Sequence, residues 1–196
     1  MRHEIATLSD SALALRVQAS GDRAAYGELV RRHQAALRAF LWRLAGSQAA
    51  ADDLAQETLI RGYERIAGFR GAAAFRTWLF AIAWREFLGG RRKAASYARA
   101  LTEAVEAETP APDADPDAAL DLQRCLLALS VEERAALLLC DASGMSHSEA
   151  SAALALPLGS VKTYVARARM KMRAALGTAP DEAEQPREDM PCRIAR

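Results

Sequence analysis

Residues 146–173, SHSEASAALALPLGSVKTYVARARMKMR, contain two short helical patterns separated by the turn residues Pro157 and Gly159. Ser146 and Glu149 have the S-x-x-E spacing of a capping box, in which each side chain binds the backbone N–H of the other residue. A helix is therefore predicted to begin there, and two helices joined by a tight turn are typical of a helix-turn-helix. The buried stripe predicted for the second helix, spaced i, i+4, i+7 and i+11, consists of Val161, Val165, Ala168 and Met172.

The second helical pattern carries several basic residues and no acidic residue. Lys and Arg side chains can neutralise DNA phosphates, and Thr163 and Arg167 are placed to reach base edges in a major groove. A basic helix can also be ordinary solvated surface, but the capped first helix, the turn and the lack of acids together favour a DNA reader. The candidate DNA contacts outside the stripe are Ser160, Lys162, Thr163, Arg167 and Lys171, with Arg169 and Arg173 as further phosphate ligands.

The composition predicts an all-α fold. The 196 residues are 51% hydrophobic, which is ample for one or two helical cores. Ala, Leu, Arg and Glu dominate, whereas β-branched residues and two-residue alternation are scarce. The first residues, MRHEIATLSD, lack the apolar core of a signal peptide, and no apolar run is long enough to span a membrane, so we expect a cytoplasmic protein.

The sequence predicts neither a catalytic site nor a metal site. The three cysteines, Cys125, Cys140 and Cys192, form no C-x-x-C pair, and their odd number does not fit a disulfide framework. No Ser/His/Asp arrangement and no glycine-rich phosphate loop is recognisable. We therefore expect a protein that is not an enzyme and that uses no cofactor, no metal and no small-molecule substrate.

Charge and proline content divide the chain into four parts. Residues 9–99 and 118–176 are two helical blocks, and residues 100–117 are an acidic, proline-rich linker between them. From position 101 to position 121 the chain has seven carboxylates and no Lys or Arg, and three prolines prevent a regular helix. Residues 177–196 contain three more prolines and few apolar residues, so we expect a disordered tail. The predicted architecture is two small helical domains joined by a flexible linker.

The first block is predicted to contain an amphipathic helix over residues 26–44 that ends at Gly46 and Ser47. A second helix is expected to start near Ala51, with acidic residues in its first turn, where the helix dipole favours negative charge. Its mixed-charge outer face fits either solvent or a partner helix. The expected core residues are Leu29, Leu37, Phe40, Leu41, Leu44, Leu59, Tyr63 and Ile66, and the outer face comprises Asp53, Gln56, Glu57, Arg61 and Glu64.

Residues 69–93, FRGAAAFRTWLFAIAWREFLGGRRK, concentrate aromatic and basic side chains. A helix cannot bury five aromatic rings on one stripe, so we expect part of this set to be exposed. Surplus rings interleaved with arginines suit single-stranded DNA, because rings stack on unpaired bases while guanidinium groups hold the backbone. An aromatic stripe alone is more often core, and Phe75, Leu79 and Ile82 are assigned to it. The five rings are Phe75, Trp78, Phe80, Trp84 and Phe87, and Arg91, Arg92 and Lys93 follow them.

The order of these segments is similar to that of a known family. DDLAQETLIRGYERI, FRGAAAFRTWLFAIA, an acidic linker, LSVEERAALLL and GSVKTYVARAR together resemble the extracytoplasmic-function (ECF) group of bacterial sigma-70 family factors. The resemblance covers about residues 22–176. It implies a promoter-melting domain, region 2, in residues 9–99, and a domain that reads the −35 element, region 4, in residues 118–176.

The resemblance also implies partners and sites. The partners are the β′ and β subunits of bacterial core RNA polymerase, promoter DNA and an anti-sigma factor. The polymerase-docking residues are then Asp53, Gln56, Glu57 and Arg61. The −10 residues are Phe69, Arg70 and Gly71, in a loop that helps hold a flipped base, and Trp78, Arg85, Arg91 and Arg92 in the helix after it. The −35 residues are Ser160, Lys162, Thr163, Arg167 and Lys171.

Four positions depart from the family pattern. Arg85 replaces the usual asparagine of the flipped-base pocket, and its longer cationic side chain can bind phosphate or read guanine. Gly89 replaces a frequent aspartate, Ser130 a proline and Tyr164 an arginine. These departures bear on the promoter sequence rather than on the class of protein.

Two other functions remain compatible with the sequence. An autonomous, dimeric helix-turn-helix regulator would need no polymerase. The DDLAQE helix and the aromatic segment would then serve only to pack the hydrophobic core. A sigma-mimicking regulator would keep the fold, capture an anti-sigma factor and never bind promoters. The acidic linker likewise has two interpretations, since it either mimics nascent RNA in the polymerase exit path or extends through charge repulsion alone.

Overall fold

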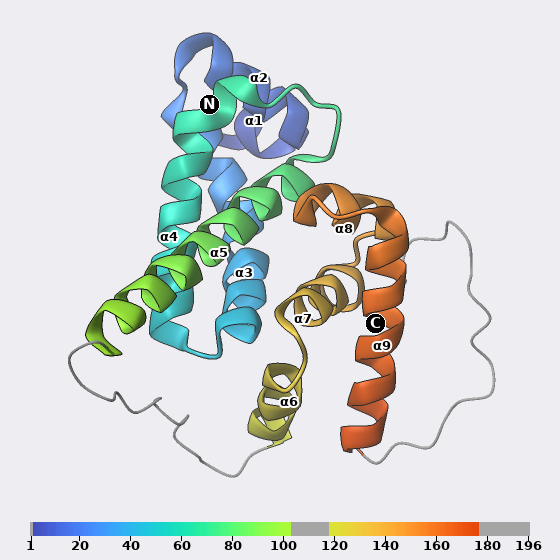
Figure 1. Cartoon of the computed structure of the whole chain (residues 1–196). Coiled ribbons are helices and arrows are strands. Elements are labelled where there is room, and N and C mark those ends of the chain that lie inside the picture. The colour runs from blue at the N-terminus through green and yellow to red at the C-terminus, as the bar shows by residue number, and fades with distance from the viewer. Residues whose placement is uncertain (1, 103–117, 177–196) are drawn as a thin grey trace, which may run out of the picture.

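The computed structural model describes residues 2–102 and 118–176, and every regular element in these two ranges is helical (Figure 1). The all-α prediction is confirmed for them. The predicted linker begins at residue 100, but α5 continues to Thr102; the remaining linker residues and the tail from 177 to 196 lie outside the described ranges. The helices are α1 (Arg2–Thr7), α2 (Asp10–Ser20), α3 (Arg23–Ala45), α4 (Gln48–Arg65), α5 (Phe75–Thr102), α6 (Ala118–Leu127), α7 (Val131–Leu137), α8 (His147–Leu154) and α9 (Leu158–Leu176), with a 3-10 turn η1 (Ile66–Gly68) and a π-helical turn η2 (Leu138–Ala142).

The first block is built around α3, which packs against α2, α4 and α5. Asp22 caps α3 by accepting hydrogen bonds from the backbone N–H groups of Ala24 and Ala25 at 2.9 and 3.1 Å, so the helix starts earlier than periodicity predicts. Ser47 caps α4, which also begins a few residues before Ala51. The five core residues predicted on α3 are all buried, and so is Ile66: Leu29, Leu37, Phe40, Leu41, Leu44 and Ile66.

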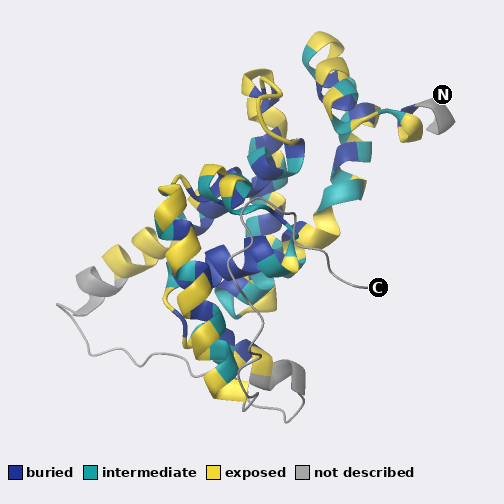
Figure 2. Ribbon diagram, turned by 90° about the vertical axis from the view of Figure 1, so that its right-hand side faces the viewer, coloured by how far each residue is buried: buried dark blue, intermediate teal, exposed yellow. Residues whose placement is uncertain are grey.

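The expectation that α5 exposes part of its aromatic set is met by Trp78 alone. Phe75, Phe80, Trp84 and Phe87 are all at most 6% exposed, and only Trp78 is partly accessible. The reason is that α5 is covered on two sides, because it contacts α3 and α4 of its own block and also α8 of the second block. Figure 2 shows the buried residues gathered where helices face one another. A helix buried on two sides has room for rings that one stripe cannot hold.

The second block contains the predicted helix-turn-helix as α8 and α9. Ser146 and Glu149 form the predicted capping box at the start of α8, and Ser130 forms a second one with Glu133 at the start of α7. Val161, Val165 and Ala168 are buried on α9, and Met172 is partly buried, as the stripe predicts. Gly159 lies inside α9 rather than before it.

The two blocks lie in contact. Besides the α5–α8 packing, α3 contacts α6, α7 and η2 of the second block. No helix in residues 2–102 or 118–176 is long and apolar enough to cross a membrane.

Candidate functional site

The position of α4 is fixed by close packing against α3. The Tyr26 hydroxyl on α3 donates to the carbonyl of Leu59, and burial raises the pKa of Tyr26 to about 12. Gly62 permits this approach, since a Cβ at that position would lie 2.8 Å from the Tyr26 oxygen. The Tyr26 and Tyr63 rings meet edge to face at 5.0 Å, but Tyr63 is 37% exposed, so its predicted core position is at the margin. Leu59 is partly buried.

This packing turns the predicted polymerase-docking residues outward. Asp53 and Gln56 are exposed, and Glu57 and Arg61 form an ion pair of 2.7 Å along the helix. The Glu57 carboxylate raises the pKa of Arg61, so the guanidinium stays charged. The outer side of α4 is therefore mostly polar, with the 48% exposed side chain of Ile60 among the charged residues.

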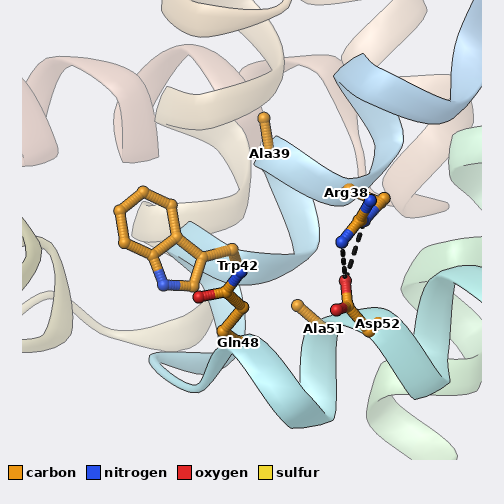
Figure 3. Close-up of a pocket in the computed structure, with 6 residues that line it drawn as sticks. All are labelled: Arg38, Ala39, Trp42, Gln48, Ala51 and Asp52. Carbon is orange, nitrogen blue, oxygen red and sulfur yellow. Dashed lines mark hydrogen bonds and ion pairs between the residues drawn. The ribbon is translucent and has the colours of Figure 1, made fainter.

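A shallow pocket of about 270 Å³ lies beside that surface, between α3 and α4 (Figure 3). Its floor is apolar, with Ala39 and Ala51, and the half-buried Trp42 ring forms one wall. Arg38 and Asp52 close another side through an ion pair of 2.6 Å. The sequence did not mark this pocket, because its residues are shared between two helices.

The loop between η1 and α5 carries the predicted −10 residues Phe69, Arg70 and Gly71. Its beginning is anchored by Gln18 on α2, whose side-chain amide donates to the carbonyls of Ile66 and Phe69 at 2.7 Å each. Phe69 is buried, which removes its ring from direct DNA contact, while Arg70 and Gly71 are exposed. Gly71 has a left-handed φ of 69°, which favours glycine at this turn.

An aromatic cluster supports the same loop. The rings of Phe69, Phe75 and Trp78 lie 5.4–5.5 Å apart in all three pairs, and His33 reaches Phe75 at 5.4 Å. Trp78 is the partly exposed member of this cluster. It is therefore the one ring of the three that a DNA base can reach.

The remaining −10 candidates lie along α5. Arg85 and Arg92 are exposed, and Arg91 places its guanidinium carbon 6.0 Å from the Phe87 ring centre. Phe87 stacks in turn on Trp84 at 6.0 Å. Arg70, Arg85, Arg91 and Arg92 are thus all open to solvent, and Arg91 in addition lies over the buried Phe87 ring.

The predicted −35 residues fall into two groups on α9. Lys162, Thr163 and Arg167 are exposed, and Lys162 and Arg167 form no hydrogen bond or ion pair with any described residue. The Thr163 hydroxyl donates to the Gly159 carbonyl at 2.9 Å, a bond within the helix. Ser160 is partly buried.

The other basic residues of α9 are engaged with the domain itself. Lys171 donates to both carboxylate oxygens of Glu133 at 2.9 and 2.7 Å, and this interaction is the largest cause of the lowered Glu133 pKa. Arg169 pairs with Asp141 at 2.8 and 3.1 Å. Burial, with Arg169 and Lys162 nearby, lowers the pKa of His147 at the start of α8, which favours its neutral form.

Two candidates were missed by the sequence reasoning. Gln18 carries no local signal, because both of its partners lie about fifty residues away in the chain, at separations of 48 and 51. Met170 is 62% exposed on the same side of α9 as Thr163 and Arg167, and a search for charged residues passes over it. An exposed apolar side chain on a reading helix can contact a thymine methyl group. No cluster of three or more potential metal ligands occurs among the described residues.

Comparisons with known proteins agree with this geometry. Residues 29–97 match the family Sigma-70 region 2, and residues 119–172 match Sigma-70, region 4. The chain is 37% identical to the ECF RNA polymerase sigma factor SigE of Mycolicibacterium smegmatis, over 85% of this chain and 68% of that protein. It is 33% identical to the ECF RNA polymerase sigma factor SigM of Mycobacterium tuberculosis, over 90% of this chain and 87% of the relative.

A solved structure shows the same arrangement of helices. The sigma factor RpoE from Bartonella quintana, in complex with the anti-sigma factor NepR, superposes with a TM-score of 0.69 at 28% identity, covering 79% of this chain and 98% of that one. The two halves of this chain match two sigma regions. The same chain has the capped helix-turn-helix, the polar face of α4 and the anchored loop before α5. The chain belongs to the ECF RNA polymerase sigma factors of the sigma-70 family.

Proposed function

We propose that this sigma factor directs core RNA polymerase to promoters by reading the −35 element with α9 and capturing the −10 element with region 2. The observation that carries the proposal is the pair of unengaged cations on the exposed side of α9. Lys162 and Arg167 have no intramolecular partner in the described residues, while Lys171 and Arg169 on the same helix do. Free cations beside an exposed Thr163 are what a recognition helix needs for phosphate and base contacts.

The outer face of α4 is the proposed docking surface for core polymerase. Asp53 and Gln56 are available to a partner, and Glu57 and Arg61 hold each other extended along the helix. The adjacent pocket offers an apolar floor beside the Trp42 ring, where a side chain of a docking helix can insert (Figure 3). The proposed partners are the β′ and β subunits of the polymerase.

The loop before α5 is the proposed site of −10 capture. Gln18 and the aromatic cluster around Phe75 hold the start of this loop in place, so that Arg70 and Gly71 lie at a fixed position. Trp78 and Arg85 are accessible beside it, whereas Phe69 acts by support and not by contact. Melting requires no ATP and no metal in this mechanism, because preferential binding of the unpaired strand shifts the equilibrium toward open DNA.

The protein is proposed to act in the cytoplasm by binding, not by catalysis, with residues 9–99 as the −10 and polymerase domain and residues 118–176 as the −35 domain. An anti-sigma factor is the proposed inhibitor, since the similar RpoE structure is itself a complex with one. The relatives are named as sigma factors, which favours this function over an autonomous dimeric regulator and over a sigma-mimicking regulator.

In vitro transcription tests the proposal. Purified core polymerase is combined with a genomic fragment library, with and without the protein, and the RNA 5′ ends are mapped. Starts that depend on the protein support a sigma factor and reveal both promoter elements together. A protein that binds neither core polymerase nor DNA but captures an anti-sigma factor would replace this function with the sigma-mimicking one.

A further inference from the structure

The loop before α5, residues 70–74, has almost no internal structure of its own. Residues 70–73 are exposed, and none of them forms a hydrogen bond or ion pair with another described residue. Ala74 contributes only its carbonyl, which accepts from the Trp78 N–H at 3.2 Å as α5 begins. The last three of these residues are alanines, whose side chains are too short to fix the loop. The geometry of the loop must therefore come from its two ends.

Phe69 is the fixed end of this loop on the η1 side. Its N–H donates to the Ile66 carbonyl at 3.0 Å, and its own carbonyl accepts from the Gln18 side-chain amide at 2.7 Å. The same amide also donates to the Ile66 carbonyl at 2.7 Å. The buried Phe69 ring meets Phe75, the first residue after the loop, edge to face at 5.5 Å. Among the described residues, Gln18 is the one side chain that bonds the backbone at this end.

The helix that carries Gln18, α2, is itself fastened near both of its ends. At its start, the Asp10 carboxylate lies 2.7 Å from Nε2 of His33 on α3. Toward its end, Arg16 donates at 2.8 Å to Asp22, the N-cap residue of α3. The helix also packs against η1, and Figure 1 shows it at the same end of the first block as the loop. Gln18 therefore relays the position of a fixed helix to the start of the loop.

We propose that Gln18 is a positioning residue that controls the rate of promoter opening and the discrimination among bases at the captured −10 position. By fixing Phe69 it sets where Arg70 and Gly71 meet the unpaired strand. Hydrogen bonds to a base edge weaken steeply outside a narrow range of distance and angle, so a displaced loop loses discrimination as well as affinity. Gln18 acts without touching DNA, since it is half-buried and its amide is occupied by two carbonyls. This role rests on the −10 capture proposed for the loop.

Three replacements of Gln18 separate hydrogen-bond donation from packing. Gln18→Leu has a similar size but no donor, and in Gln18→Glu a carboxylate faces the two carbonyl oxygens at neutral pH. Gln18→Lys keeps a donor on a side chain one bond longer. Gln34→Leu on the exposed side of α3 is the matched control, because it removes a glutamine amide that bonds no described residue.

An arginine-specific protease tests the positioning without DNA or polymerase. The peptide bond after Arg70 becomes a better substrate when the loop is released, because proteolysis requires a locally mobile chain. In the free, full-length chain, Gln18→Leu and Gln18→Glu should raise the cleavage rate at Arg70 by about tenfold through the loss of two hydrogen bonds. Gln18→Lys and Gln34→Leu should stay near the wild-type rate. Cleavage at the wild-type rate in Gln18→Leu and Gln18→Glu overturns the positioning role.

Reconstituted holoenzyme tests the consequence for promoters, on a promoter identified by mapping RNA 5′ ends. Gln18→Leu should bind core polymerase as wild type does but open DNA about tenfold more slowly, measured by permanganate reactivity of unpaired thymines. Its affinity for the −10 single strand should also depend less on the captured base, which is the position where an abasic site weakens wild-type binding most. Gln18→Lys should restore both properties.

A general loss of structure would instead lower core binding and helix content together, so circular dichroism accompanies each variant. Where Gln18→Leu loses helix content, the comparison of Gln18→Glu with Gln18→Lys decides the question. Equal opening rates and equal base dependence in Gln18→Glu and wild type overturn the role of Gln18, and the sigma function stands. A wild-type protein that opens no promoter overturns −10 capture itself.

Discussion

Replacement of Arg167 by alanine tests the proposal that α9 binds promoter DNA. The side chain is exposed and has no partner among the described residues, so it is free to neutralise one phosphate. Each neutralised phosphate contributes about 0.9 to the slope of log affinity against log salt concentration. Arg167→Ala should therefore lower the magnitude of that slope by about 0.9. As the salt concentration rises from about 50 to about 200 mM, the ratio of wild-type to variant affinity for DNA should therefore fall by about 3.5-fold.

The assay is fluorescence anisotropy of a labelled promoter fragment with reconstituted holoenzyme at several salt concentrations. Arg169→Ala is the matched control, because Arg169 is already paired with Asp141 at 2.8 Å and is therefore less available to neutralise a phosphate. The control should change the slope by less than half as much as Arg167→Ala. A wild-type slope for Arg167→Ala, or a larger slope change for Arg169→Ala, would refute the division of α9 into free and engaged cations.

Three further changes probe the folded chain. Phe80→Ala removes a fully buried ring that lies 5.2 Å from Phe40, and should cost about 3–5 kcal/mol in urea unfolding followed by circular dichroism. Ala155→Gly relieves a left-handed φ of 54° between α8 and α9, and should raise the stability of region 4 by about 0.5–1 kcal/mol in the same assay; no gain would show that the turn is unstrained. Glu133 has a pKa lowered below its ordinary 4.5 mainly by Lys171, so its stabilisation is complete above that value and is lost as the pH falls. Wild type should then lose more stability than Glu133→Gln between about pH 5 and about pH 3, and parallel curves for the two proteins would contradict this.

Features with a local cause were predictable from the sequence. The Ser146–Glu149 capping box and the stripe through Val161 and Val165 depend on spacings of three and four residues, and both are present. The buried side of α3 follows from the same periodicity. Such patterns are reliable because residues three or four positions apart lie on the same face of a helix and therefore share one environment.

Features that depend on distant partners were not predictable. The burial of four of the five rings on α5 was not predictable, because periodicity within one helix contains no information on the second domain that also contacts α5. Lys171 was expected at DNA, but its partner Glu133 lies 38 residues away in the chain. Arg134 lies in the segment LSVEERAALLL, and nothing near it in the sequence indicates that its Nη1 donates to the carbonyl of Leu44, 90 residues away, at 2.6 Å.

The two-sided burial of α5 has a consequence for how promoter preference can diverge among gene duplicates. A substitution at Phe80 or Trp84 disturbs the buried packing of α5, so few replacements there leave a working protein. Replacement of Lys162 or Arg167 disturbs no buried packing, since both side chains are exposed. Under the proposed function, new −35 preferences can therefore arise by single substitutions on α9 at little cost in stability, whereas new −10 preferences depend on a few tolerant positions such as Arg70 and Arg85.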